Sequence, residues 1–319
     1  MTSSVLGGKR MRLLGRSLLI VAMLLETYGI ALAWHDTGHM VIAQIAYLNL
    51  TPAAKAKIDS LLITPPGKRP LIHLCAGYYD AQTCERTYNP IEIAVWMDDI
   101  RGDSLNDSYG PWHYVDFPFF DGVPEHASAG PEPENALMRI NWAISSLRRG
   151  TSGRDRRDAE LVGFLYHLIG DVHQPLHAST RVTSAHLDGD QGGNLFNVRM
   201  TTDTGISNLH AFWDAAGGAF GFGSVKRPLD AAGRDRILSL ARGLMKTYPL
   251  QSLPEAKDLD PHTWVMESSK LARDVAYKNI ADGGTPSNAY IEAAQNLSKK
   301  RIALAGYRLA GVLNTLFAN

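Results

Sequence analysis

The chain has 319 residues, 45% hydrophobic and 20% charged, and its 32 basic residues balance its 32 acidic ones. This length can bury a sizeable core in one large domain or two small ones. The neutral charge excludes a nucleic-acid binder that relies on a basic surface, so bound metal would have to supply the positive charge that such a ligand needs.

Residues 1–33 have the pattern of a cleaved secretory signal peptide. A basic stretch, Lys9–Arg16, precedes the apolar run Ser17–Leu25, and Ala31–Ala33 forms an A-x-A cleavage site. The apolar run is too short to span a bilayer, although a short membrane anchor is the alternative. Cleavage removes four basic residues and one acidic residue, which leaves 28 against 31 and a net charge of −3 for residues 34–319. We expect a secreted or periplasmic protein without integral membrane association.

The mature part, residues 34–319, is expected to be one mostly helical domain with a small β-hairpin. Apolar residues recur at helical spacing, and Pro and Gly clusters separate the segments. Cys75 and Cys84 lie in a loop-like stretch, and in an exported protein they favour a local disulfide. Residues 112–119 are expected to be extended, and Leu195–Met200 has strand character that predicts the hairpin. The predicted helices are about 34–50, 51–62, 91–101, 134–148, 157–173, 207–216, 228–247, 261–279 and 288–317.

The stretch Phe164–His177 concentrates metal-competent side chains. His167 and Asp171 are four residues apart and therefore share one face of a helix. Pro175 ends that helix, and His177 follows it. Imidazole and carboxylate are the ligands that Zn²⁺ prefers when no thiolate is offered. The alternative is a helix with an ordinary buried histidine. His173 in the same stretch either supports the metal ligands or points to solvent, and we expect the latter.

Similar groups occur elsewhere in the chain, and together they are too many for one zinc ion. A structural zinc takes four protein ligands and a catalytic zinc takes three, so a set of this size suits three ions that share a bridging carboxylate. The set consists of the α-amine and carbonyl of Trp34 with His39, Asp98, His113, His167, Asp171, His177, His210 and Asp214.

The order of these motifs resembles that of the zinc-dependent single-strand-specific nucleases of the S1/P1 type, whose fold is shared with bacterial zinc phospholipase C. The resemblance spans residues 34–214. It rests on Trp34-x4-His39, Trp96-x-Asp98-x2-Arg101, Trp112-His113-x2-Asp116, His167-x3-Asp171-x5-His177 and His210-x3-Asp214. Asp99 is an alternative to its neighbour Asp98, but the W-x-D spacing favours Asp98.

The resemblance implies an arrangement of three zinc ions. Asp98, His113, His167 and Asp171 would hold the first, and His177, His210 and Asp214 the second. The Trp34 amine and carbonyl with His39 would hold the third, bridged to the first by Asp171. Such ions would activate water and stabilise the leaving oxygen. The implied activity is an endonuclease that cleaves single-stranded DNA and RNA to 5′-phosphorylated products, with 3′-nucleotidase activity and no stable protein partner.

Three further residues are candidates outside the metal set, and each has an ordinary alternative. Arg101 suits a substrate phosphate or a surface ion pair. Asp116 suits orientation of the nucleophile or of the Trp34 amine, or is a turn carboxylate. Asn194 resembles a base-contacting residue or belongs to a plain turn. The aromatic residue on which a base would stack is not identified; the candidates are Tyr78, Tyr79 and Phe119.

Two other functions fit the same residues. A zinc phospholipase C would keep the ions and change the pocket, but in that branch the last ligand is expected to be glutamate, whereas here it is Asp214. A non-catalytic zinc-binding protein is the second alternative; a bridged metal pair with open positions is a costly way merely to hold metal.

Overall fold

The computed structural model describes Met1 and residues 34–62, 89–100, 107–126, 130–149, 155–223 and 225–318. Residues 1–30 and 31–319 form separate units, and apart from Met1 every described residue belongs to the second. Within these ranges no helix combines the length and the apolar character that a membrane crossing requires. The expected disulfide, Arg101, Tyr78 and Tyr79 fall outside the described residues.

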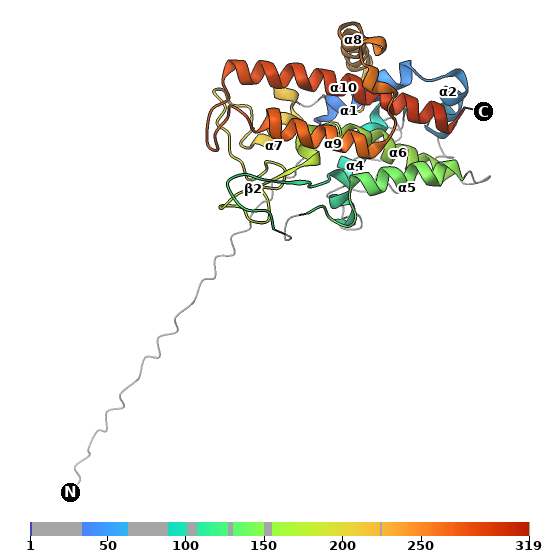
Figure 1. Ribbon diagram of the computed structural model, residues 1–319. Coiled ribbons are helices and arrows are strands. Elements are labelled where there is room, and N and C mark those ends of the chain that lie inside the picture. Colours follow the sequence, from blue (N-terminus) through green and yellow to red (C-terminus); the bar gives the residue numbers. More distant parts are fainter. Residues whose placement is uncertain are drawn as a thin grey trace. The chain divides into compact units, whose positions relative to one another are not determined.

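Helices dominate the second unit, which confirms the prediction of a mostly helical fold (Figure 1). The α-helices are α1 (Asp36–Leu48), α2 (Pro52–Leu62), α4 (Trp96–Asp99), α5 (Ala136–Arg148), α6 (Asp155–Asp171), α7 (Leu209–Asp214), α8 (Ala231–Thr247), α9 (Pro261–Leu271) and α10 (Asn288–Leu316). Shorter helical turns are η2 (Glu92–Val95), η3 (Asp107–His113), η4 (Pro175–Ala178), η5 (Ala216–Gly218), η6 (Leu250–Ser252), η7 (Pro254–Lys257) and the π-helical η8 (Ala272–Ala276).

Local side-chain caps fix the starts of α5, α7, α8, α9 and α10. The carboxylate or amide oxygen of Asn135, Asn208 and Asp230 accepts a hydrogen bond from a backbone N–H in the first turn of α5, α7 and α8. Asp260 and Ser287 do the same for α9 and α10. Each cap satisfies an N–H group that has no partner within its helix, so these residue types decide where the helices begin.

The core lies around α1, a helix with few polar positions. Its residues Met40–Ala43 are fully buried, and α1 packs against α10, α8, α6 and η2. The long helix α10 runs beside α1 in Figure 1, while α5 packs on α6. Because α1, η2 and α6 meet in the core, polar side chains that they turn inward are brought together away from water.

The sheet in the structure is a pair of three-residue parallel strands and not the expected β-hairpin. Strands β1 (Pro118–Phe120) and β2 (Thr180–Val182) pair in parallel, with Pro118 opposite Thr180. A parallel pair needs a long crossover and cannot be closed by a tight turn. The expected hairpin at Leu195–Met200 does not form, because Asn197 bridges Asn208 while Val198 bridges Gly284, so neither pairing continues.

The segment predicted as extended, residues 112–119, also differs in part. Trp112 and His113 close the 3-10 turn η3, and extended backbone begins only after them. Val115 donates its N–H to the carbonyl of His177 at 2.7 Å, and Thr180 donates to the carbonyl of Phe117 at 3.0 Å. The chain that leaves His113 therefore runs beside the chain that leaves His177.

His173 is fully buried, so the expectation that it points to solvent is wrong. Its Nδ1 donates to the carbonyl of Ile169 at 2.7 Å, and its Nε2 accepts from the Arg308 guanidinium at 3.0 Å. Burial first, and then the positive charges of Arg301 and Arg308, hold the pKa of His173 well below its usual value. The ring is therefore neutral and joins the end of α6 to α10.

Glu267 of α9 compensates the two arginine charges. It accepts from Arg308 at both carboxylate oxygens, at 2.7 and 2.8 Å, and from Arg301 at 2.8 Å. Arg301 also donates to the carbonyl of His173 at 3.1 Å. Although burial raises the pKa of Glu267, the hydrogen bonds from the two arginines lower it overall. This network fixes the segment just beyond Asp171.

We predict that Glu267→Gln lowers the free energy of unfolding by about 3 kcal/mol at pH 7, because two buried guanidinium groups lose their counter-charge. Since the folded-state pKa of Glu267 is lowered, its contribution is complete above the unfolded pKa of about 4.3 and is lost as the pH falls through the folded value. Urea denaturation at several pH values measures the difference, which should narrow at acid pH.

The matched control is Glu134→Gln, because the Glu134 side chain is 64% exposed and pairs with Arg139 at the surface. Its loss should lower the free energy of unfolding far less, because solvent and salt screen an exposed ion pair. Equal destabilisation by the two substitutions would contradict the role given to Glu267.

Candidate metal centre

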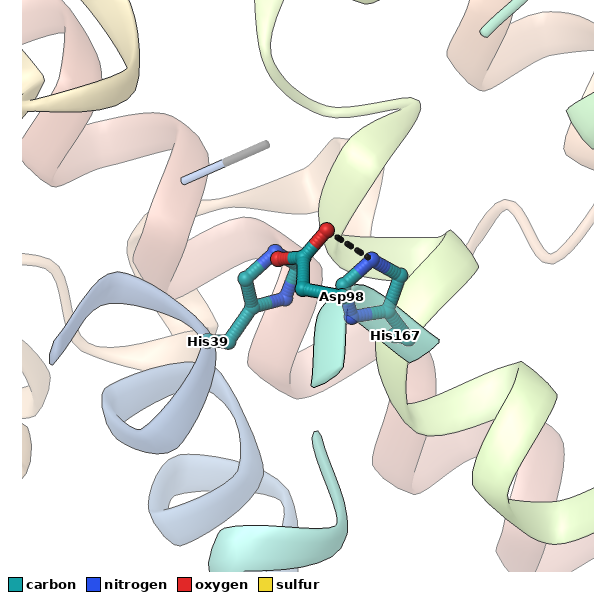
Figure 2. A group of neighbouring side chains, drawn as sticks. All are labelled: His39, Asp98 and His167. Carbon is teal, nitrogen blue, oxygen red and sulfur yellow. Dashed lines mark ion pairs between the residues drawn. The ribbon is translucent and has the colours of Figure 1, made fainter. Parts of the chain in front are cut away.

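Buried histidines and aspartates from α1, α4, η3 and α6 meet in one cluster. Figure 2 shows His39, Asp98 and His167 reaching toward one another from three separate elements. Their exposed fractions do not exceed 8%, the value for Asp98. Three groups in the described chain could each hold a metal ion. They are His39 with Asp98 and His167, His113 with His167 and Asp171, and His177 with His210 and Asp214.

Asp171 stands between His113 and His167 on one side and His39 on the other. Its Oδ2 lies 3.2 Å from His113 Nδ1 and 3.3 Å from His167 Nε2. Its Oδ1 lies 3.3 Å from His39 Nε2. Each carboxylate oxygen therefore faces a different set of imidazoles, which is the geometry that a bridging carboxylate needs.

Asp98 completes this part of the cluster. Its Oδ1 lies 3.8 Å from His113 Nδ1 and 3.7 Å from His167 Nε2. The neighbouring Asp99 instead binds the guanidinium of Arg227. Of the two adjacent carboxylates, Asp98 is the one beside the histidines.

The second part of the cluster follows α6. His177 lies on η4, and His210 and Asp214 lie one turn apart on α7. The two Nε2 atoms of His177 and His210 are 3.0 Å apart, and each lies 3.5 Å from an oxygen of Asp214. The carbonyl of His113 accepts from His177 Nδ1 at 2.8 Å, which joins this part to the first.

Backbone carbonyls fix the protonation of three rings. His167, His177 and His210 each place Nδ1 within 2.8 Å of a carbonyl, contributed by Ala94, His113 and Gly192 respectively. A carbonyl only accepts, so each Nδ1 carries a hydrogen, and each Nε2 is the nitrogen that faces the cluster and can offer a lone pair when the ring is neutral. Lone pairs and carboxylates at these distances repel one another unless a cation or a proton lies between them. This donor set of imidazole nitrogens and carboxylate oxygens therefore fits a divalent metal.

The ring pKa values indicate how the cluster behaves without metal. Burial lowers the pKa of His167, but the charges of Asp171 and Asp98 outweigh burial and raise it to about 9. Burial, followed by the charge of His167, lowers the pKa of His39 to about 4. His39 is thus neutral and ready to bind, whereas His167 retains a proton that a metal must displace, so metal binding competes with protons.

Burial raises the pKa of Asp171, yet His167 and the hydrogen bonds from neighbouring histidines bring it well below its usual value. Burial likewise opposes ionisation of Asp214, but the pKa of Asp214 is lowered overall by His210 and His177. Both aspartates are therefore anions at neutral pH and can act as ligands.

Trp34 lies against this cluster through its side chain. The indole is fully buried and donates Nε1–H to the carbonyl of Gly170 at 2.9 Å. Gly170 also touches the His39 ring: a Cβ built there would lie 2.9 Å from Nδ1. A larger residue at position 170 would force the His39 ring to move, so the close approach of α6 to His39 requires glycine there.

Asp116 lies beside the second part of the cluster. Burial, and then the charge of Asp190, raise the pKa of Asp116 to about 7, while the charge of His177 opposes this shift. Asn194 is partly exposed, and its amide donates to the carbonyl of Gln191 at 2.8 Å. The third outer candidate, Arg101, lies outside the described residues. Phe119 packs edge-on against Tyr277, with ring centroids 5.2 Å apart.

Two supporting features were missed by sequence reasoning. Gln174 donates to Asp214 Oδ1 at 2.7 Å and accepts from the N–H of Leu176 at 2.6 Å. Gly192 lies in a turn with φ of +61°, and its carbonyl accepts a hydrogen bond from His210 Nδ1. Gln174 lies inside the central stretch and could have been flagged as a polar residue between ligands. A backbone carbonyl leaves no such signal in the sequence.

Comparison with known proteins gives a consistent set of similarities. A sequence model of the S1/P1 nuclease family matches residues 34–318. Endonuclease 1 of Arabidopsis thaliana is 28% identical over 301 residues, which cover 90% of this chain and 88% of that protein. Endonuclease 5 of the same plant is 30% identical over 316 residues, covering 94% and 96%. Nuclease S1 of Aspergillus oryzae is 25% identical over 324 residues, covering 96% and 98%.

We predict that Gln174→Met weakens metal binding at His177, His210 and Asp214 by about 10- to 100-fold, the usual loss when a residue that orients a ligand is removed. Methionine keeps the volume of the side chain and removes the hydrogen bond to Asp214. Competition with a chromophoric chelator measures the affinity. The control Gln295→Met removes a similar amide, bound to the Gly217 carbonyl at 2.8 Å, and should leave the affinity unchanged. A normal affinity in Gln174→Met would refute this role.

Proposed function

The chain belongs to the S1/P1 nuclease family, and from this premise we propose that it is a zinc-dependent endonuclease. Its substrates are single-stranded DNA and RNA, its products carry 5′-phosphates, and it also removes 3′-phosphates from nucleotides. The observation that carries the proposal is the set of imidazole nitrogens and carboxylate oxygens that face one another around Asp171, a donor set that fits divalent cations.

The proposed metal content is three zinc ions. Asp98, His113, His167 and Asp171 hold the first; His177, His210 and Asp214 the second; and His39 with the Trp34 amine and carbonyl the third. The two-sided position of Asp171, with one oxygen toward His39 and the other toward His113 and His167, supports its role as the bridge. The absence of thiolates from the described donor set supports zinc bound by nitrogen and oxygen.

Removal of residues 1–33 is part of the proposal. A free amine at Trp34 exists only after residues 1–33 are removed, so the precursor is inactive and the mature protein is secreted or periplasmic. Two facts support this: the family match begins at Trp34, and the Trp34 indole is anchored beside His39 through Gly170.

Bound zinc would supply the charge that activates water and stabilises the leaving oxygen of a phosphodiester. The chain itself provides the rest. Arg101 binds a non-bridging phosphate oxygen, Asp116 orients the attacking water, and Asn194 contacts a base. Because the cluster is buried, the phosphate must reach deep into the protein, which a flexible single strand with unstacked bases can do.

The proposal is tested on the chain processed to Trp34. Elemental analysis should give about three zinc ions per chain, in accord with paired-metal hydrolases. Activity is then compared on single-stranded DNA, RNA, a 3′-nucleotide and phosphatidylcholine, each with and without chelator. We expect chelator-sensitive cleavage of the nucleic acids and the nucleotide. Lipid cleavage alone would identify a phospholipase C instead, and bound zinc without any hydrolysis would identify a zinc-binding protein.

We predict that Asp171→Asn abolishes turnover and lowers the zinc content, because two ions lose a shared anion. The loss of turnover should exceed the roughly 100-fold typical of residues that only support a ligand. The control Asp274→Asn removes an exposed carboxylate that pairs with Lys270 and should behave as the wild type. Full activity in Asp171→Asn would rule out the bridge.

A further inference from the structure

Arg227 joins two carboxylates that lie next to the metal cluster. Its Nε donates to Asp36 Oδ2 at 2.8 Å, and its Nη1 and Nη2 donate to the two oxygens of Asp99 at 2.8 and 2.5 Å. The arginine side chain is 7% exposed, and each carboxylate is 18% exposed. This is a nearly buried pairing of one guanidinium with two acids.

The two carboxylates, Asp36 and Asp99, are close in the sequence to two residues of the cluster, His39 and Asp98. Asp36 begins α1 and lies three residues before His39, while Asp99 follows Asp98 directly in α4. His39 and Asp98 share one of the possible metal groups (Figure 2). Arg227 therefore connects the two backbone segments whose separation decides whether His39 and Asp98 can reach the same ions.

The segment that carries Arg227 has an independent anchor on the same side. The N–H of Leu229 donates to Glu92 Oε2 at 3.1 Å, and Asn89 donates to Glu92 Oε1 at 3.1 Å. Glu92 belongs to η2, which leads directly into α4. Because the backbone near Arg227 is held to η2, the position of the Arg227 guanidinium is fixed, and its bond to Asp36 positions the start of α1.

The chemistry requires arginine at this position. The planar guanidinium offers a fork to both oxygens of Asp99 while its Nε edge remains available to Asp36. A lysine ammonium is a single point charge and cannot reproduce this planar, three-bond pattern.

We propose that Arg227 is a positioning residue for the metal cluster, which clamps Asp36 to Asp99 so that His39 and Asp98 converge. This inference rests on the proposed metal binding. It also predicts that the metal sites respond differently to the loss of Arg227. His177 and His210 lie on other elements, η4 and α7, and the carbonyls of His113 and Gly192 fix their rings. Loss of Arg227 should therefore weaken the sites of His39 and Asp98 and spare that of His177 and His210.

The test compares the processed wild type with Arg227→Met, Arg227→Lys and Asp36→Asn. Zinc is removed stepwise with chelators of increasing strength and counted at each step. We expect Arg227→Met to keep one tightly bound zinc and to bind the others about 10- to 100-fold more weakly. Arg227→Lys should recover part of this loss, and Asp36→Asn should show a smaller loss of the same kind.

Two further measurements separate positioning from general damage. Cobalt absorption spectra should change for the weakened sites only, and the thermal midpoint of the metal-free chain is recorded for every variant. The matched control is Arg236→Met, which removes an exposed guanidinium bound to the Phe220 carbonyl at 2.8 Å and should bind zinc like the wild type. If Arg227→Met does not fold, the zinc affinities of Arg227→Lys and Asp36→Asn decide whether Arg227 positions the cluster.

The outcomes are distinguishable. A wild type that binds no zinc overturns the proposed function and the clamp with it. A wild type loaded with zinc and variants with the same affinities overturn the clamp alone. Equal weakening of every site, together with a lower thermal midpoint of the metal-free chain, also overturns it, because the arginine would then support only the fold.

Discussion

Electrostatic repulsion between buried polar groups is the constraint on which this structure depends. Carbonyls of Ala94, His113 and Gly192 turn three imidazoles so that their Nε2 atoms face inward, where they meet the carboxylates of Asp171 and Asp214. Desolvated groups of this kind cannot stay together uncompensated. The fold brings them together nevertheless, so protons or cations must compensate the carboxylates in the folded state.

The sequence was informative wherever function follows from regular spacing. His167 with Asp171, and His210 with Asp214, are four apart and share a helix face, as the pattern predicts. It was least informative where a partner is distant. His173 was misplaced because the arginines that bury it lie on α10, and the hairpin failed because Asn197 and Val198 have different partners. Contacts across such separations leave no periodic signal in the chain.

Charged groups surround the cluster on more than one side. The network of Arg301, Arg308 and Glu267 holds the segment after Asp171. Arg227 links the start of α1 to the end of α4 through Asp36 and Asp99. Buried ion pairs contribute little net stability compared with apolar packing, but each is costly to break. Their value here is geometric, since a planar guanidinium fixes direction as well as distance.

One residue belongs to both halves of the cluster. The ring of His113 lies with His167 and Asp171, while its own carbonyl holds the ring of His177. A shift of this backbone by a fraction of an ångström therefore alters both halves together. A change at position 113 therefore cannot be assigned to one half alone: replacing the ring removes a group beside Asp171, while moving the backbone releases the ring of His177.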